Sequence, residues 1–317
     1  MQISRRRAIA GTAAVSTTLL LPRSAWGADT LTVRIAAAPD DDITPILYAQ
    51  SAGIFKRNGL DVQFQSLTSG SATAAAVIGG SIDIGKSSLV NLIAAHARNV
   101  PFVIVAPASL YTDSSPIAGF IVAKDSPIKS ARDLNGKTVS ASSLKDLIAV
   151  ATQAWIDENG GDSKLVHFLE MPTSAVPPAL ETHRIDGATV VTPALAEALD
   201  TGKTRLIGRS FSAIAKRFLV AGWFTTRDYM TKNGEAVKRF ATAFREAAAY
   251  TDTHRAETVA LLAAYSKIAE STIRTMVRST AGNALDPKDI EPVIAAAVRY
   301  KVIDKPFPAS ELIAAVR

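Results

Sequence analysis

The sequence predicts an α/β fold of two lobes, and three patterns lead to this prediction. Apolar runs that suit strands alternate with helical patterns over residues 31–97. The same alternation returns over residues 137–208, and from residue 232 onward the apolar residues fall at helical spacing. Strands that alternate with helices build parallel sheets. We therefore expect two sheets with helices around them, and a helical C-terminal segment that packs on the first lobe.

The first lobe should contain three strands and three helices. In order, they are a strand at 33–38, a helix at 46–55, a strand at 60–67, a helix ending at 78, a strand at 82–85 and a helix at 89–98. Each strand runs into a polar loop, at 39–42, 68–73 and 86–88. Ligands of open parallel sheets bind beyond the carboxyl ends of the strands, so these loops should line a binding edge. Helix capping is the alternative role of their Ser, Thr and Asp residues.

The chain should cross between the lobes twice. A buried strand at 102–106 is followed by a loop at 107–116, and a strand at 119–123 should make the first crossing. We expect it to pair with the return crossing at 218–224, which would form a hinge. The second lobe should hold strands at 137–141, 166–169, 187–191 and 206–208. A helix at 144–158 should be capped by Ser142 and Ser143, and another helix should start at Thr192 and Pro193. The predicted divisions are 28–118, 119–223 and 224–317.

Residues 1–27 have the features of an export signal. Arginines at 5–7 precede an apolar run, and small residues at 25 and 27 suit a signal peptidase. The arginine pair resembles a twin-arginine signal, and a general secretory signal is the alternative. This segment holds four arginines and no acid, so its removal lowers the formal net charge from +6 to +2. The remaining chain has no clustered basic stripe, which argues against nucleic-acid binding.

Several motifs resemble the substrate-binding proteins of nitrate, sulfonate, taurine and thiamine-precursor ABC importers, an NMT1-like group of type II periplasmic binding proteins. They are YAQSAGIFKRNGLDV at 48–62, SGSA at 69–72, GSIDIG at 80–85, DLNGKTV at 133–139 and RIDGA at 184–188. The resemblance implies a monomeric periplasmic protein that closes two lobes on a small polar ligand. It further implies delivery of that ligand to a permease in the inner membrane, with no cofactor and no metal.

The resemblance also implies where the ligand lies. In this family it is held between the lobes, by the loops after the first three strands, by a helix start in the second lobe and by a residue near the return crossing. The matching positions are Asp41, Asp42, Ser69, Gly70, Ser71, Ala72, Lys86, Ser87, Ser88, Ser142, Ser143, Thr192 and Trp223. Trp223 would offer a stacking face or belong to the hinge core, and both alternatives stay open. Lys86 departs from the small or aromatic residue expected there, which leaves the substrate class open.

The acidic run at 40–42 has two interpretations. It is a solvated turn with a helix cap, or one carboxylate accepts a hydrogen bond from an amine or hydroxyl of the ligand. A purely anionic ligand would require these carboxylates to face away or to be offset by Lys86 or Lys145. A zwitterion or an amino-bearing heterocycle would use both signs of charge.

The sequence offers no constellation typical of an enzyme. It has no cysteine, and its four histidines are scattered without metal-ligand spacing. Residues 131–138 resemble a phosphate loop, but they open a predicted strand instead of a helix. We therefore expect no catalytic residue. The alternatives are a binding protein for an aminopyrimidine, an enzyme like the eukaryotic pyrimidine-synthesis branch that resembles this family, and a sensor domain.

Overall fold

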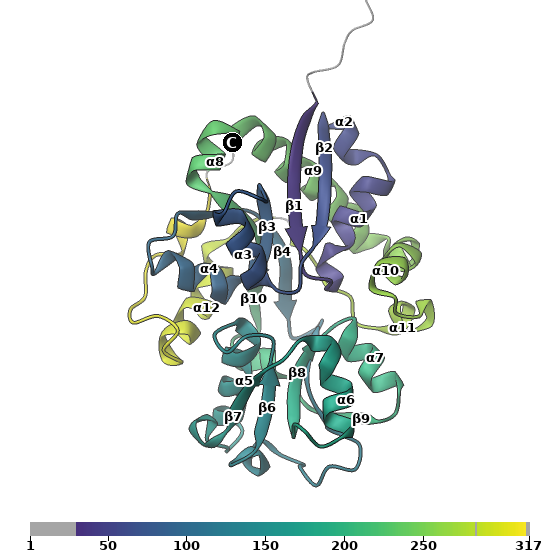
Figure 1. Ribbon diagram of the computed structural model, residues 1–317, viewed down its shortest axis with the longest axis vertical. Coiled ribbons are helices and arrows are strands. Elements are labelled where there is room, and N and C mark those ends of the chain that lie inside the picture. Colours follow the sequence, from purple (N-terminus) through teal and green to yellow (C-terminus); the bar gives the residue numbers. More distant parts are fainter. Residues whose placement is uncertain (1–29, 283, 315–317) are drawn as a thin grey trace, which may run out of the picture.

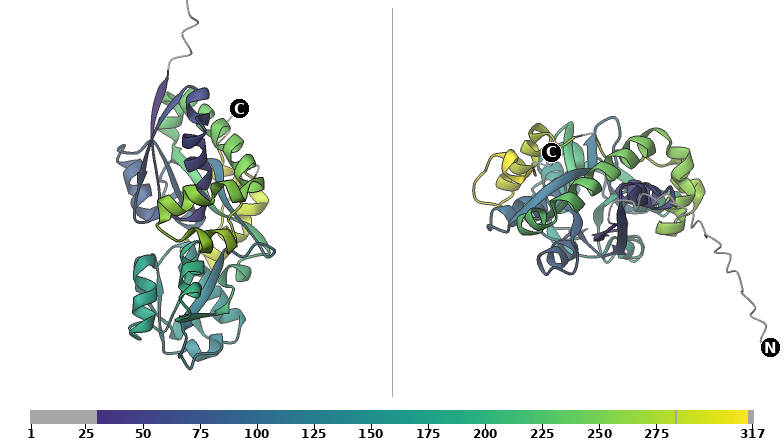
Figure 2. Two further views of the ribbon diagram at one scale, coloured as in Figure 1. Left: turned by 90° about the vertical axis from the view of Figure 1, so that its right-hand side faces the viewer. Right: turned by 90° about the horizontal axis from the view of Figure 1, so that it is seen from above.

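The computed structural model describes residues 30–282 and 284–314, which form two lobes that lie end to end along the long axis (Figures 1 and 2). The predicted export signal at 1–27 lies outside the described residues. Each lobe is built on a five-stranded sheet with helices on its faces. In the described part of the chain, no helix is long and apolar enough to cross a membrane.

The first sheet has the order β2-β1-β3-β10-β4. Its strands are β1 (Leu31–Ala37), β2 (Leu60–Ser66), β3 (Ile84–Ser88), β4 (Phe102–Thr112) and β10 (Arg217–Thr226). Strands β1, β2 and β3 are parallel, as the alternating pattern predicted, whereas β10 runs antiparallel to β3 and β4. The α-helices of the N-terminal segment are α1 (Thr44–Ser51), α2 (Ile54–Arg57), α3 (Gly70–Ile78) and α4 (Leu89–His96).

The second sheet has the order β7-β6-β8-β5-β9. Its strands are β5 (Ala118–Ala123), β6 (Thr138–Ala141), β7 (His167–Glu170), β8 (Gly187–Val191) and β9 (Thr204–Gly208), and its α-helices are α5 (Leu147–Glu158), α6 (Val176–Glu181) and α7 (Ala194–Asp200). The strands β6, β7 and β8 are parallel, and β5 runs antiparallel to β8 and β9. The predicted strands of this lobe are confirmed to within about two residues.

The C-terminal part returns to the first lobe. It contains α8 (Arg227–Lys232), α9 (Gly234–Thr253), α10 (Val259–Ser266), α11 (Glu270–Thr275) and α12 (Pro287–Arg299). Helix α9 packs against α1, and α12 packs against α4 and β10, which confirms that these helices cover the first lobe. The expectation of continuous helix from residue 232 was wrong at 276–286 and 300–308, where the described chain is not helical.

The predicted hinge pairing was wrong. Strand β5 pairs with β8 and β9 in the second sheet, and β10 pairs with β3 and β4 in the first. The segment at 218–224 therefore belongs to the first lobe by sheet membership, and not to the second as the predicted division at 223 had it. The paired strands at the junction are β4 and β10.

The predicted loop at 107–116 was also wrong, because β4 continues through Pro107 to Thr112. Proline cannot donate a hydrogen bond within a sheet and is tolerated at edges and bulges. Strand β4 is an edge strand, and its register against β10 shifts where Pro107 pairs with Gly222. Pro107, which suggested a turn in the sequence, therefore marks a shift of register in an edge strand.

Several helix and strand boundaries also differ from the prediction. The predicted helix at 46–55 is divided into α1 and α2, and α3 starts at Gly70, inside the predicted loop at 68–73. Strand β3 extends to Ser88, so residues 86–88 lie on the strand and not in a loop. Helix α5 starts at Leu147 with Asp146 as its N-cap, three residues later than predicted. Helix α7 starts at Ala194, with Pro193 in the cap position after a cis peptide bond from Thr192.

Candidate ligand-binding cleft

A cavity of about 490 Å³ lies between the lobes. From the first lobe, the lining includes Asp40, Asp42, residues 66–71, Lys86, Ser87, Ser88 and Asn91. From the second lobe, it includes Ser142, Ser143, Asp146, residues 172–174, residues 191–194 and Glu197. The C-terminal part contributes Ser266, Ile268 and Ser279. Apolar side chains also line it, among them Leu67, Leu147 and Phe211. This volume is in the range of sites for small organic molecules.

The polar segments after β1 and β2 and the polar end of β3 all reach this cavity. Ser69 caps α3 by accepting a hydrogen bond from the amide of Ala72 at 3.2 Å, and its hydroxyl lies 3.0 Å from that of Ser71. Ser88 caps α4 by accepting a hydrogen bond from the amide of Asn91. Both interpretations of these residues therefore apply, because each serine caps a helix and also lines the cavity.

Lys86 forms a buried ion network at the cavity wall. Its ammonium donates to a carboxylate oxygen of Asp42 and lies 3.2 Å from Oδ2 of Asp40. Burial lowers the pKa of Lys86, but the charges of Asp42 and Asp40 outweigh it, and the net shift is upward. Burial raises the pKa of Asp42 to about 6, against the opposing effect of Lys86. The charge of Lys86 is thus largely compensated inside the protein.

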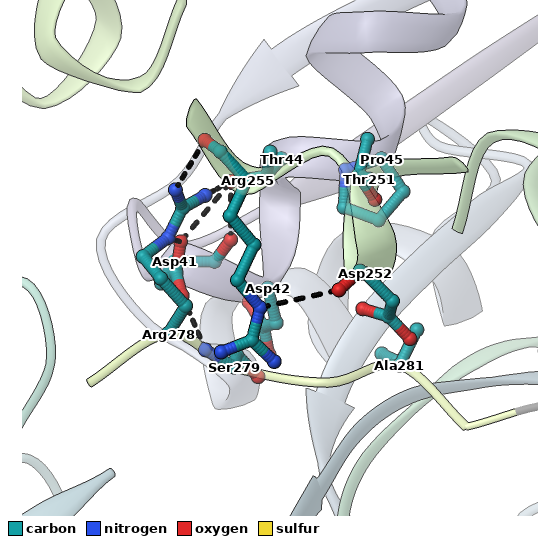
Figure 3. A pocket seen from close by; sticks show the side chains of 11 residues that line it. Asp41, Asp42, Thr44, Pro45, Thr251, Asp252, Arg255, Arg278, Ser279 and Ala281 are labelled. Carbon is teal, nitrogen blue, oxygen red and sulfur yellow. Dashed lines mark hydrogen bonds and ion pairs between the residues drawn. The ribbon is translucent and has the colours of Figure 1, made fainter. Parts of the chain in front are cut away.

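Asp41 does not line the cleft, in contrast to the prediction. Its carboxylate accepts a hydrogen bond from Nε of Arg278 at 2.8 Å and another from the backbone amide of Ser279 (Figure 3). Both charged side chains are buried, at 2% and 7% exposed. Arg278 also donates to the hydroxyls of Thr44 and Thr258. Asp41 therefore ties the C-terminal segment to the first lobe beside a small pocket of about 10 Å³.

Asp146 lines the cleft from the second lobe, and the sequence analysis missed it. Its carboxylate accepts hydrogen bonds from the amide of Ala149 at 2.9 Å and from the hydroxyl of Ser142. Burial raises the pKa of this carboxyl to about 6. The signal was present in the sequence, since an Asp directly before an apolar helical run is typical of an N-cap. The predicted caps, Ser142 and Ser143, lie four and three residues before Asp146, which is the N-cap of α5.

Trp223 does not line the cavity either. It lies on β10 in the first lobe with no exposed surface, and its ring packs against Phe240 and Phe244 at centroid distances of 5.5 and 5.8 Å. The hinge-core alternative is therefore closer to the structure than the stacking role. Ala72 is also absent from the lining.

The remaining predicted residues converge on the cavity. They are Asp42, Ser69, Gly70, Ser71, Lys86, Ser87, Ser88, Ser142, Ser143 and Thr192. Lys145, considered as a counter-charge, is exposed and outside the lining. Among the described residues, no group of three or more His, Cys, Asp or Glu is arranged to hold a metal ion.

The chain is similar in structure to several periplasmic binding proteins. The aliphatic sulphonate binding protein SsuA from Escherichia coli superposes with a TM-score of 0.71 at 18% identity, covering 89% of this chain and 92% of that one. The alkanesulfonate-binding protein SsuA from Xanthomonas axonopodis pv. citri, bound to MOPS, has a TM-score of 0.76 at 14% identity, covering 90% of this chain and 99% of that one. The nitrate-binding protein NrtA from Synechocystis PCC 6803 gives 0.74 at 15% identity with 87% and 82% covered.

Similar curated sequences are those of 4-amino-5-hydroxymethyl-2-methylpyrimidine phosphate synthases. The protein of Schizosaccharomyces pombe is 30% identical over 95 residues, which is 30% of this chain and 26% of that protein. The THI11 protein of Saccharomyces cerevisiae is 31% identical over 112 residues, 35% and 32% of the two chains. The matched segments thus span about a quarter to a third of these relatives.

The family model described as "NMT1/THI5 like" matches residues 40–258, which is more than half of the chain. This range includes the acidic residues 40–42 after β1, the whole second lobe and most of the residues that line the cavity. The chain therefore belongs to the NMT1/THI5-like family and has the two-lobed α/β fold of periplasmic binding proteins.

Proposed function

We propose that this protein is the solute-binding component of an ABC importer, which closes its lobes on a small polar ligand and releases it to a permease. The observation that carries the proposal is the cavity to which both lobes contribute polar side chains. A ligand in that position favours the closed state, because only there does it contact both lobes. Its fold relatives include sulfonate-binding and nitrate-binding proteins, which supports the same role.

The proposal includes the setting in which the protein acts. We infer export through the segment at 1–27, by a twin-arginine or a general secretory route, and cleavage near residue 27. The protein would then work as a periplasmic monomer that meets its permease at the inner membrane. It needs no cofactor and performs no chemistry in this scheme.

The charge of the cleft favours a ligand with amino groups or other hydrogen-bond donors over a simple oxyanion. Among the described lining residues, Asp40, Asp42, Asp146 and Glu197 are acidic, and Lys86 is the single cation. Because Lys86 already pairs with Asp40 and Asp42, an added anion would meet little uncompensated positive charge. Charges about 4 Å apart at an intermediate dielectric interact by several kcal/mol. A zwitterion or an amino-bearing heterocycle fits this balance better than nitrate.

The sulfonate candidate keeps support from the fold relatives, and the aminopyrimidine candidate from the pyrimidine phosphate synthases that match part of the chain. A thermal-shift screen of residues 28–317 would separate them. The panel holds nitrate, alkyl and amino sulfonates, aromatic carboxylates, aminopyrimidines and bicarbonate. A ligand at one hundred times its Kd adds about 2.7 kcal/mol to the stability, which shifts Tm by several degrees. Stabilisation by amino-bearing compounds is the expected result.

Cleft-filling variants complete the test. Ser71→Trp from the first lobe and Ser143→Trp from the second should each abolish the ligand-dependent shift, because each side chain lines the cavity. Ser310→Trp, at an exposed position outside the lining, is the matched control and should keep it. Unchanged affinity in both cleft variants would refute the assignment of the cleft. Turnover of the stabilising compound into a new product would favour the enzyme alternative.

A further inference from the structure

The lobes contact each other on two sides of the cleft, and the two contacts differ in kind. On one side, α5 of the second lobe packs against α4 and α12 (Figure 1). One apolar cluster there includes Leu147 and Val150 from α5 together with Ile290 and Ile294 from α12. The hydroxyl of Tyr300 also donates to Asp157 at 3.0 Å. Separating this side would expose a large apolar surface to water, which is costly.

On the opposite side, α11 lies against α7 (Figure 1). The contact centres on a hydrogen bond in which the hydroxyl of Thr272 donates to Oδ2 of Asp200 at 2.6 Å. Thr272 is 7% exposed, whereas Asp200 is an exposed residue at the end of α7. At the other end of this helix, the amide of Asp41 lies 3.4 Å from the carbonyl of Thr192. Ala196 of α7 also packs against the apolar cluster of the first lobe, but its methyl group buries less apolar surface than the leucine, valine and isoleucine side chains on the opposite side.

We propose that Thr272 and Asp200 form a latch that sets how often the cleft is closed. The apolar side stays packed and acts as the pivot, and the cleft opens between α7 and α11. The hydrogen bond then exists only in the closed state, so it raises the closed population. Neither residue lines the cavity, and each therefore acts as a positioning residue without touching ligand. Where ligand is concerned, this inference rests on the proposed function.

The latch predicts a defined effect on affinity. The apparent affinity of a ligand scales with the population of the binding-competent state. A hydrogen bond to a charged acceptor is stronger than one between neutral groups, although exposure of Asp200 to water weakens it. Removing the Thr272 hydroxyl should therefore weaken ligand binding about three- to tenfold. The loss should appear as faster dissociation.

The experiment measures closure directly. The chain has no cysteine, so Lys56→Cys in the first lobe and Lys203→Cys in the second give two specific spin-label positions, both exposed. The interlobe distance distribution is recorded without ligand for the labelled parent and for Thr272→Val, which keeps the shape of the side chain. We expect the variant to shift population from the short distance to a longer one.

Three further variants make the result specific. Thr275→Val is the matched control, because that hydroxyl donates to the carbonyl of Ser271 in its own helix and should leave the distances unchanged. Thr272→Ser keeps a hydroxyl and should behave like the parent. Asp200→Ala should reproduce the effect of Thr272→Val, and combining them should add nothing further.

The outcomes separate this inference from the proposed function. The distances are measured without ligand, so the latch is tested even if no compound in the screen binds. A parent that lacks the short distance, or a Thr272→Val distribution equal to that of the parent, would overturn the latch. Ligand binding that stays at the level of the parent in Thr272→Val would overturn it too, while leaving the cleft assignment intact.

Discussion

Lys86 and Asp42 show how a single buried pair decides the character of the cleft. The ammonium and the carboxylate are 4% and 7% exposed, and each has lost most of its hydration. Such a pair is retained because the removal of one partner leaves a buried charge without compensation. The ion pair therefore holds the Lys86 and Asp42 side chains in place at the cavity wall. It leaves little uncompensated positive charge for a ligand.

Replacement of Lys86 tests this structural role. Lys86→Met should lower the free energy of unfolding by about 3–5 kcal/mol, because Asp42 stays buried without its partner. The double variant Lys86→Met with Asp42→Leu should recover most of that loss, since both charges are then gone. Denaturant unfolding of the three proteins measures the difference. A single variant as stable as the wild type would contradict the buried ion pair.

Asp146 makes a second prediction, on pH. Its folded pKa of about 6 exceeds the unfolded value of about 3.9, so between these values the folded protein binds more protons than the unfolded one. Titration of the Asp146 carboxyl therefore lowers the free energy of unfolding as the pH rises from about 4 to 6, by up to about 3 kcal/mol. Asp146→Asn, which can still cap α5, should remove this slope.

The pH profile of stability needs a control at an exposed carboxylate. Asp228 is 71% exposed, and Asp228→Asn should leave the profile unchanged. The measurement is the difference in unfolding free energy between each variant and the wild type at several pH values. Equal slopes in Asp146→Asn and the wild type would mean that the Asp146 carboxyl titrates normally.

At the scale of elements, the fit of α3 against β3 places the polar turn of the first lobe at the cavity. Gly85 on β3 provides the room for this contact. A Cβ at that position would lie 2.6 Å from Cγ2 of Thr73, 2.8 Å from Cγ2 of Val77 and 3.0 Å from Cε1 of Phe224. These are distances at which neighbours must move. The absence of a side chain at Gly85 therefore sets how closely α3, with Ser69 and Ser71 at its start, approaches the sheet.

Gly85→Ala should lower the free energy of unfolding by about 1–3 kcal/mol, because it overpacks the α3–β3 contact. It should also weaken ligand binding through displacement of α3. The control is Gly234→Ala at the start of α9, where an added Cβ would meet nothing within 4 Å. Alanine there should be neutral or stabilise by less than about 1 kcal/mol. Chemical denaturation compares the two, and equal stability in both variants would argue against the tight contact.

At the scale of the whole molecule, the lobes share an apolar cluster as well as a cleft. Leu147, Val150 and Phe211 of the second lobe belong to the same cluster as Ile290 and Ile294 of the first. Loss of either lobe would expose the other lobe's share of this surface to water. The two lobes should therefore depend on each other for stability, although each has a sheet of its own.

This shared cluster predicts one cooperative unfolding transition. Calorimetry of the ligand-free protein should give a single peak whose calorimetric enthalpy equals the van't Hoff enthalpy. Truncation of Ile294 to alanine should cost about 2–5 kcal/mol and lower the Tm of the whole molecule. Two resolved peaks in the wild type would show that the lobes unfold independently.

The sequence by itself determined the local architecture of this protein. The periodicity of apolar residues located the parallel strands of both sheets, and the polar loop predicted at 68–73 overlaps the start of α3. These features depend on neighbours within a few residues, which is why a pattern can predict them. The alternating patterns also predicted two lobes, and the resemblance supplied ten of the residues that line the cleft, including Lys86 and Thr192.

Only the tertiary structure decided which distant groups meet. Asp41 pairs with Arg278, which is 237 residues away along the chain. Its carboxylate therefore holds the C-terminal segment against the first lobe and does not line the ligand cavity. Trp223 is buried because β10 joins the first sheet between β3 and β4, where α9 covers it. Local patterns cannot specify such pairs, since the order of strands and the partner of a buried charge depend on how whole elements pack. The charge balance of the cleft and the latch between α7 and α11 follow from that packing.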